Sequence, residues 1–343
     1  MKKNDVRLFG FVLLLGWFSP ISLAEEWSKK TGMPTPRLWC AACTLNGKIY
    51  AIGGSAEGPP LSTIEEFDPV SNEWTQKPNM PVAKASMSAC VVDDEIYVIG
   101  GWAALPNVTF LATTETYDPV LEQWANKRNM PTARAFFSTG VVNGKIYAIG
   151  GVPDQLGPVL PIVEEYDPML NIWRRKADML TARAGASASV VDGKIYVIGG
   201  VTQVQGPVLD TVEAYDPVLD KWTIAADMPT ARTALSTSVA NGKIYAIGGT
   251  AEVTGPGLAT VEEYDPATDT WTSHPDMPTP RVFLSTSAVD GIIYAIGGTA
   301  AGVGPGLPTV ESYGIGFGVE VKGNFVTFLG TLKMSGKTVT SGK

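Results

Sequence analysis

The sequence predicts an all-β protein, a six-bladed β-propeller whose blades each contain four antiparallel strands. The first observation is an eight-residue stretch, GKIYAIGG at Gly47–Gly54, that returns five more times with small changes. The second is a tryptophan that recurs at the same interval as the Gly-Gly pair, about 50 residues, and such an interval is typical of propeller blades. The third is that no segment combines sustained helical periodicity with helix caps. The doublets begin at Gly53, Gly100, Gly150, Gly199, Gly248 and Gly297, and the tryptophans are Trp27, Trp74, Trp124, Trp173, Trp222 and Trp271.

The four strands of one blade can be followed in the fourth unit. RAGASASVV (Arg183–Val191) is rich in small and β-prone residues, and the Asp192-Gly193 dipeptide after it is a two-residue hairpin signal. KIYVIGG is nearly all apolar, as expected for a strand buried on both faces, and the glycine pair ends it. A loop leads to TVEAYDP, the third strand, and KWTIAADMP is the fourth. Each strand is short and followed by a turn signal, which favours an antiparallel sheet.

These units resemble the Kelch repeat. The features that carry the resemblance are the Gly-Gly doublet after an apolar strand, the VE-x-YDP segment and the spaced tryptophan. An aromatic residue precedes Asp-Pro in five units, and the resemblance covers residues 27–313. The aromatic residues before Asp-Pro are Phe67, Tyr117, Tyr166, Tyr215 and Tyr264. The resemblance implies the propeller fold.

The two ends of the repeat region predict how the ring closes. WSKKTGMP (Trp27–Pro34) is a fourth strand without the first three, and Arg281–Tyr313 supplies three strands without a fourth. We therefore expect the N-terminal strand to complete the last blade, which would leave no open sheet edge at the seam.

The chain divides into three expected regions. Residues 1–24 are predicted to be a signal peptide, because basic residues precede an apolar run, Leu8–Phe18, that is too short to span about 30 Å of hydrocarbon. Residues 25–313 form the propeller. Residues 314–343 are a Gly/Lys-rich tail, expected to be loosely held, with a short hairpin over VEVKGNFVTFLG as the alternative. We expect a secreted or periplasmic monomer that does not insert into a membrane after signal removal.

Charge and cysteine content limit the partners and the redox chemistry. The formal charge is −8, and without residues 1–24 it is −10, with 23 basic and 33 acidic side chains. An acidic surface argues against nucleic acid and anionic lipid. Cys40 and Cys43 would point to opposite faces of an extended strand, about 10 Å apart, and cannot join. For Cys43 and Cys90, at equivalent places on adjacent blades, both a bridge and two buried thiols stay open.

One basic residue and one glutamate recur in every unit. Because a residue present in all blades serves all blades, we expect the basic residues to pair with the glutamates and with backbone carbonyls between blades. The alternative is a positive ring that grips an anion, in which the arginines would be binding residues. The basic residues are Arg37, Lys84, Arg134, Arg183, Arg232 and Arg281, and the glutamates are Glu65, Glu115, Glu164, Glu213, Glu262 and Glu311.

Binding is expected where the units differ, on the face that carries the long loops after Gly-Gly and the MPTAR connections. Two residues after each basic residue stands a variable row, which strand alternation would place on one face of the first strand. In ligand-binding members of the family, this row tends to face the pocket. The candidate binding residues are Trp39, Phe136 and Phe283 of the row and Trp102 and Phe110 of the second loop. The alternative is that these aromatic side chains only plug the end of the channel.

The residue inventory offers little for catalysis. His274 is the only histidine, which excludes a copper radical oxidase, a Kelch-propeller activity that needs several, and leaves a Ser-His-Asp triad without an evident partner. No His, Cys or carboxylate cluster has metal-ligand spacing, so we expect no metal and no cofactor. One enzymatic alternative is implied by the resemblance, since some secreted bacterial Kelch propellers are sugar-acid epimerases. There an arginine would hold the substrate carboxylate while a carboxylate or arginine transfers the proton.

The sequence therefore favours a secreted, non-catalytic module that binds a protein or glycan ligand through the loop-bearing rim. A periplasmic N-acetylneuraminate epimerase or mutarotase is the alternative.

Overall fold

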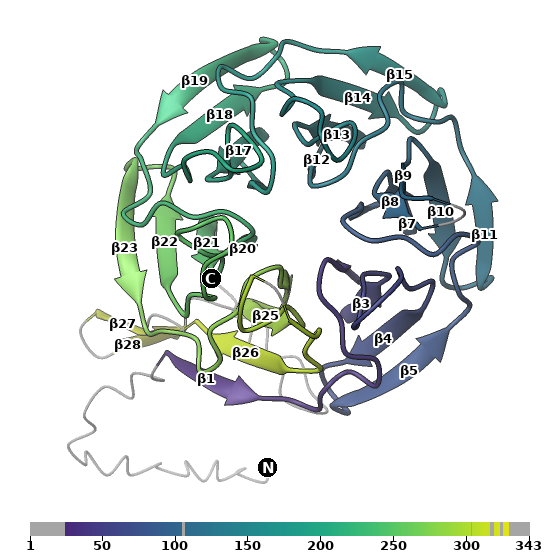
Figure 1. Ribbon diagram of the computed structural model, residues 1–343. Coiled ribbons are helices and arrows are strands. Elements are labelled where there is room, and N and C mark those ends of the chain that lie inside the picture. The colour runs from purple at the N-terminus through teal and green to yellow at the C-terminus, as the bar shows by residue number, and fades with distance from the viewer. Residues whose placement is uncertain (1–24, 105–106, 303, 316–318, 323–324, 329–343) are drawn as a thin grey trace, which may run out of the picture. The chain divides into compact units, whose positions relative to one another are not determined.

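The computed structural model describes residues 25–104, 107–302, 304–315, 319–322 and 325–328. Within these residues the regular structure is entirely β, and six four-stranded antiparallel sheets stand around a central axis (Figure 1). The predicted six-bladed propeller is confirmed. Residues 1–24, the expected signal peptide, lie outside the described residues. In the described part of the chain, no helix is long and apolar enough to cross a membrane.

Each blade runs from an inner first strand to an outer fourth strand. Blades 1 to 3 are β2 (Ala41–Leu45), β3 (Lys48–Ile52), β4 (Ile64–Asp68), β5 (Glu73–Lys77); β6 (Ser88–Val92), β7 (Glu95–Ile99), β10 (Thr114–Asp118), β11 (Gln123–Asn126); and β12 (Ser138–Val142), β13 (Lys145–Ile149), β14 (Val163–Asp167), β15 (Ile172–Arg175). Blades 4 to 6 are β16 (Ser187–Val191), β17 (Lys194–Ile198), β18 (Val212–Asp216), β19 (Lys221–Ala225); β20 (Ser236–Ala240), β21 (Lys243–Ile247), β22 (Val261–Asp265), β23 (Thr270–His274); and β24 (Ser285–Val289), β25 (Ile292–Ile296), β26 (Val310–Gly314), β1 (Glu26–Lys29).

Two short hairpins lie outside the blades. β8 (Trp102–Ala103) pairs with β9 (Thr109–Phe110) in the second long loop. β27 (Val319–Lys322) pairs with β28 (Phe325–Phe328) in the C-terminal tail, which is the short hairpin given above as the alternative for this stretch.

The ring closes between the first and last strands of the propeller. β1 pairs antiparallel with β26, from Glu26 opposite Gly314 to Lys29 opposite Glu311, as the incomplete end units predicted. Trp27 stacks on Tyr313 with ring centroids 5.1 Å apart. The sixth blade is thus built from both ends of the segment Glu26–Ile315, which forms one unit of the fold.

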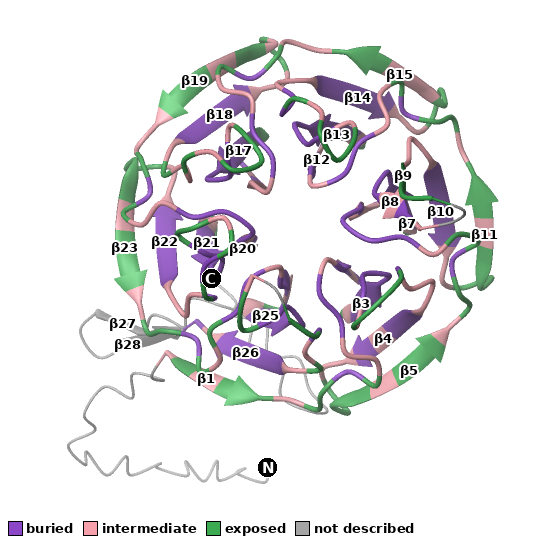
Figure 2. Ribbon diagram, viewed as in Figure 1, coloured by how far each residue is buried: buried purple, intermediate pink, exposed green. Residues whose placement is uncertain are grey.

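Burial follows the position of a strand in its blade. The second and third strands are the most deeply buried, and for the second strands the apolar sequences predicted this: Ile49 and Ile52 of β3 are fully buried. The fourth strands are the most exposed and form the outer wall of the ring (Figure 2). The hydrophobic clusters contain residues of neighbouring blades, so apolar burial between blades stabilises the ring.

The repeated tryptophans and glycines hold adjacent blades together. Trp222 of β19 packs on Tyr215 at 4.9 Å, and its indole nitrogen donates a hydrogen bond to the Ala177 carbonyl of the preceding blade at 3.0 Å. The doublet glycines have positive φ, and a Cβ on Gly54 would lie 2.6 Å from the Leu38 carbonyl oxygen. Only glycine permits this close approach of two backbones.

Loss of the closing strand should destabilise the whole ring. Deleting residues 25–34 removes the Trp27–Tyr313 stack and exposes the edge of β26, so we expect the melting temperature to fall by about 10 °C or more. Deleting residues 319–343 is the control and should change the melting temperature by less than about 2 °C. Differential scanning calorimetry of both truncations makes the comparison, and the opposite order would show that the tail closes the ring.

Candidate functional site

A closed belt of backbone hydrogen bonds surrounds the axis at the loop-bearing end. It is formed by the variable row, one residue per blade, and each amide donates to the carbonyl of the equivalent residue in the preceding blade. Around the belt, the donors and acceptors are Trp39 to Phe283, Ser86 to Trp39, Phe136 to Ser86, Gly185 to Phe136, Ala234 to Gly185 and Phe283 to Ala234, at 2.8–3.2 Å. Six blades therefore share one cyclic set of hydrogen bonds.

We expected the belt residues to belong to the first strands, and this expectation was wrong. All six have positive φ, between 52° and 63°, and the first strands begin two residues later, for example at Ala41. Positive φ is unfavourable for residues other than glycine, and five of the six are not glycine. The cyclic hydrogen bonds hold this strained bend, which turns the side chains to a common end of the ring.

Aromatic side chains fill one half of the belt. The Trp39 ring makes edge-on contacts with Trp102, Phe136 and Phe283, with centroids 6.2, 6.3 and 5.4 Å apart. These partners belong to the second, third and sixth blades, so Trp39 lies across the belt. The indole nitrogen of Trp102 donates to the Ser86 hydroxyl at 3.3 Å. Four of the five sequence-predicted aromatic residues thus form one cluster, and Phe110 packs beside Val152 and Val159.

An apolar pocket occupies the other half of the belt. Its volume is about 310 Å³, and it lies over the two smallest belt residues, Gly185 and Ala234. The remaining wall comes from three phenylalanines and from valines of the long loops of blades 3, 4 and 5. These residues are Phe110, Phe136 and Phe283, and Val152, Val159, Val201, Val204 and Val253. We call this cavity the mouth pocket.

The mouth pocket combines predicted and unpredicted residues. Phe110, Phe136 and Phe283 line it, whereas Trp39 and Trp102 support it from the aromatic cluster. The valines and the small residues Gly185 and Ala234 were not among the predicted binding residues. For Gly185 and Ala234 the sequence does contain a signal, because these two consecutive small residues interrupt the aromatic residues of the variable row.

Below the belt, hydroxyl groups line the axial channel. The first strands contribute serine and threonine side chains to a cavity of about 210 Å³. These hydroxyls bond between blades, as in Ser88 to Thr139 at 2.7 Å and Ser236 to Thr286 at 2.9 Å. Because the groups largely satisfy one another, we assign this layer to blade packing.

The five candidate arginines are buried inside their own blades. Each is at most 1% exposed, and its guanidinium bonds the third-strand glutamate and the carbonyl of the first doublet glycine. The Arg–Glu distances are 2.5–2.7 Å for Arg37–Glu65, Arg183–Glu213, Arg232–Glu262 and Arg281–Glu311, and Arg134–Glu164 and Lys84–Glu115 are paired in the same way. We expected pairing between blades, but each cation pairs with a glutamate of its own blade. We therefore leave these arginines out of the candidate site.

Burial lowers the pKa of four of these arginines. Desolvation lowers the pKa of Arg134, Arg183 and Arg232, and that of Arg281 to about 10, while the glutamate partners act in the opposite direction. The glutamate partner and the hydrogen bonds to carbonyl groups offset the desolvation penalty and keep the guanidinium charged. The side chains have no exposed atoms with which to grip a second anion.

The comparisons with known proteins agree with this geometry. The Kelch motif model matches residues 36–81, 83–131, 133–180, 182–229 and 231–278, more than half of the chain. The chain belongs to the Kelch repeat family. A solved structure described as "Structure of YjhT" has a TM-score of 0.70 and 16% identity, over 87% of this chain and 98% of that chain. At this identity, the likeness concerns the Kelch propeller fold alone.

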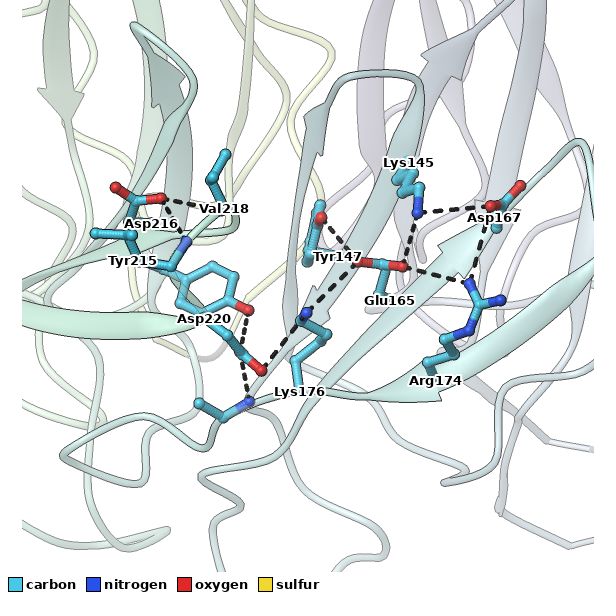
Figure 3. A network of polar contacts seen from close by, with 12 residues as sticks. Lys145, Tyr147, Glu165, Asp167, Arg174, Lys176, Tyr215, Asp216, Val218 and Asp220 are labelled. Atoms are coloured by element: carbon cyan, nitrogen blue, oxygen red, sulfur yellow. Dashed lines mark hydrogen bonds and ion pairs between the residues drawn. The ribbon is translucent and has the colours of Figure 1, made fainter.

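A second polar network joins the third and fourth Kelch units (Figure 3). Glu165 accepts the Tyr147 hydroxyl at 2.9 Å, and Lys176 lies between Glu165 at 3.9 Å and Asp220 at 3.5 Å. Tyr215 donates to Asp220 at 2.5 Å. None of these side chains lines the mouth pocket. Lys145 and Arg174 also lie within 4 Å of Glu165 and Asp167, so each of these carboxylates has a cation partner and the network serves the seam between blades.

The remaining reactive side chains are also engaged in the Kelch fold. His274 lies 3.0 Å from Tyr313 through Nδ1 and 3.0 Å from Glu263 through Nε2, at the seam between blades 5 and 6. Cys40, Cys43 and Cys90 are free thiols, and burial raises the pKa of each. The described residues contain no group of three or more His, Cys, Asp or Glu side chains that could hold a metal.

The second blade offers a test of the buried pairs, because Lys84 stands where the other blades have arginine. Its ammonium bonds the side chains of Thr113 and Glu115, whereas Arg183 also bonds the carbonyls of Gly199 and Thr211. We expect Lys84→Arg to raise the free energy of unfolding by about 1–2 kcal/mol by adding these bonds.

The matched control is Arg183→Lys, which should lower the free energy of unfolding by a similar amount. Urea denaturation of both variants measures the two effects. If Lys84→Arg is destabilising while Arg183→Lys is neutral, the carbonyl bonds do not contribute as argued.

Proposed function

We propose that this Kelch propeller is a secreted or periplasmic, monomeric, non-catalytic binding module that takes an apolar group of a protein partner into the mouth pocket. The observation that carries the proposal is the pocket itself. It is concave, almost wholly apolar, and close to the lower end of the size range of ligand sites, which is about 300 Å³. Its backbone is held by the cyclic belt, so the site is formed before a ligand arrives.

The chemistry of the wall favours an apolar side chain over a sugar. Among the lining residues, only Asp154, Gln155 and Thr233 have polar side-chain atoms. A glycan hydroxyl that entered this pocket would lose its hydrogen bonds to water without replacement, which is costly. An aromatic or aliphatic side chain would instead gain about 1.5–3 kcal/mol from burial. Of the two ligand classes that we expected, a protein partner is therefore the better match.

Ala234→Phe provides a direct test of the pocket. Ala234 has φ 53°, nearly the same as Phe136 at 55° and Phe283 at 57°, so a phenylalanine is compatible with the belt backbone here. Its ring would occupy the pocket, and we expect the affinity for the neutral probe acetyl-phenylalanine-amide to fall by at least about tenfold. An NMR titration measures the dissociation constant.

Ala267→Phe is the matched control, since Ala267 is exposed on the turn after β22, outside the pocket lining. The same substitution there should leave the affinity unchanged. Equal binding of the probe to wild type and Ala234→Phe would remove the mouth pocket as the binding site.

The alternative function, a sugar-acid epimerase, has less support from the site. An arginine for the substrate carboxylate is needed, and the five candidate arginines are paired with glutamates inside the blades. We expect the wild-type protein to leave the rate of anomer exchange of N-acetylneuraminate unchanged. Exchange spectroscopy by NMR measures this rate, and an acceleration that requires folded protein would favour the enzyme over the binding module.

A further inference from the structure

The long loops around the mouth pocket carry charge of one sign only. The six loops, residues 55–63, 102–113, 152–162, 201–211, 250–260 and 299–309, contain no lysine, arginine or histidine. They contain four acidic residues, and all four are exposed. The acidic residues are Glu57, Asp154, Asp210 and Glu252. The exposed charges of these loops are therefore all negative.

One of these carboxylates lines the pocket, and a second is next to a lining residue in sequence. Asp154 lines it directly, and Glu252 precedes Val253, which is also a lining residue. Both lie on turns that internal hydrogen bonds hold in place. The Asp154 carboxylate accepts the Leu156 amide at 2.8 Å, and the Glu252 carbonyl accepts the Thr250 hydroxyl at 2.7 Å and the Gly255 amide at 3.0 Å. The fold thus fixes the Asp154 carboxylate and the backbone of the turn that carries Glu252.

Several basic residues that lie close in sequence to this end of the ring are already paired. The ring of arginines and Lys84 is buried against the third-strand glutamates. Three lysines that end or follow outer strands also have carboxylate partners: Lys77 lies 3.5 Å from Glu66, Lys127 lies 3.4 Å from Glu95, and Lys176 lies 3.5 Å from Asp220. The negative charge of the loops is therefore not offset by cations within the same loops.

We propose that the mouth pocket recognises a basic segment of its partner, in which an apolar side chain is flanked by lysine or arginine. The apolar side chain enters the pocket, while the flanking cations lie over Asp154 and Glu252. This inference rests on the proposed function and names the partner chemistry of the same site. Charge complementarity of exposed groups adds modest affinity and strong salt dependence, because solvent and ions screen it. The phenylalanine rings of the wall add a favourable surface for a cation.

Three peptides with the same central side chain separate charge from burial. The probes are acetyl-Lys-Phe-Lys-amide, acetyl-Gln-Phe-Gln-amide and acetyl-Glu-Phe-Glu-amide. At low ionic strength, we expect the cationic peptide to bind about tenfold more tightly than the neutral one, and the anionic peptide to bind most weakly. The preference should shrink severalfold at about 0.5 M salt. NMR titration of the full-length protein gives all three dissociation constants.

Charge-neutral variants locate the effect. The double variant Asp154→Asn, Glu252→Gln should bind the cationic peptide about three- to tenfold more weakly and leave the neutral peptide unaffected. Glu73→Gln is the control, because Glu73 is exposed at the start of the outer strand β5 and outside the pocket. It should change neither affinity.

The outcomes distinguish this inference from the function on which it rests. Equal affinity for cationic and neutral peptides, both lost in Ala234→Phe, would overturn the basic partner and keep the apolar pocket. A cationic preference that the double variant retains, or tighter binding of the anionic peptide, would also overturn it. If no peptide binds to wild type more tightly than to Ala234→Phe, the proposed function fails and this inference fails with it.

Discussion

The six buried cations hold the propeller together in two directions at once. Within a blade, the side chain of Arg183 joins the first-strand connection to Glu213 of the third strand and to the Gly199 carbonyl that ends the second. Between blades, the backbone carbonyl of the same residue accepts the Gly151 amide of the preceding blade. The second doublet glycine makes this bond in all six blades. One repeated residue therefore fixes both the internal geometry of a blade and its distance from the neighbour.

The buried ion pairs limit which charged side chains are available at the mouth of the ring. A buried arginine must be paired, since removal of one partner leaves an uncompensated charge. The glutamates that recur in the third strand are thus committed to the scaffold, as are the arginines. The loop-bearing end therefore consists of apolar side chains, glycine and proline turns, and a few carboxylates. Neither the buried cations nor their glutamate partners contribute charge to the mouth, so its charge is that of the loop carboxylates.

Much of the fold could be predicted from the sequence, because it depends on features that every unit repeats. The strand order, the blade number and the closing pair of β1 with β26 follow from spacing and from the incomplete end units. The position of the variable row could not be derived in this way. Strand alternation places Trp39 within an extended strand, whereas the belt hydrogen bonds impose a left-handed bend that involves residues of two other blades. Such a bend depends on contacts distant in sequence.

The candidate site was predictable only in its aromatic half. Phe136 and Phe283 could be identified from the sequence because they are large. A cavity also needs positions with small side chains, and a small residue in one blade forms a cavity only if the adjacent belt residue is small as well. Gly185 and Ala234 are adjacent in the belt and opposite to the aromatic cluster, an arrangement that appears only when the ring is closed. The same holds for Asp154, whose loop meets those of blades 4 and 5 at the pocket.

The belt shows how a symmetric ring can carry an asymmetric site. Its backbone conformation is the same in all blades, with φ between 52° and 63°, so a change of side chain at any of the six positions alters the mouth without moving the scaffold. The strain of positive φ at non-glycine residues is of order 1 kcal/mol each, and the hydrogen bonds of the closed belt offset it. Because every blade offers the same bend, the location of the pocket is decided by which two adjacent residues are small. Here that choice places the cavity over blades 4 and 5, where the neighbouring loops contribute valines and carboxylates but no cation.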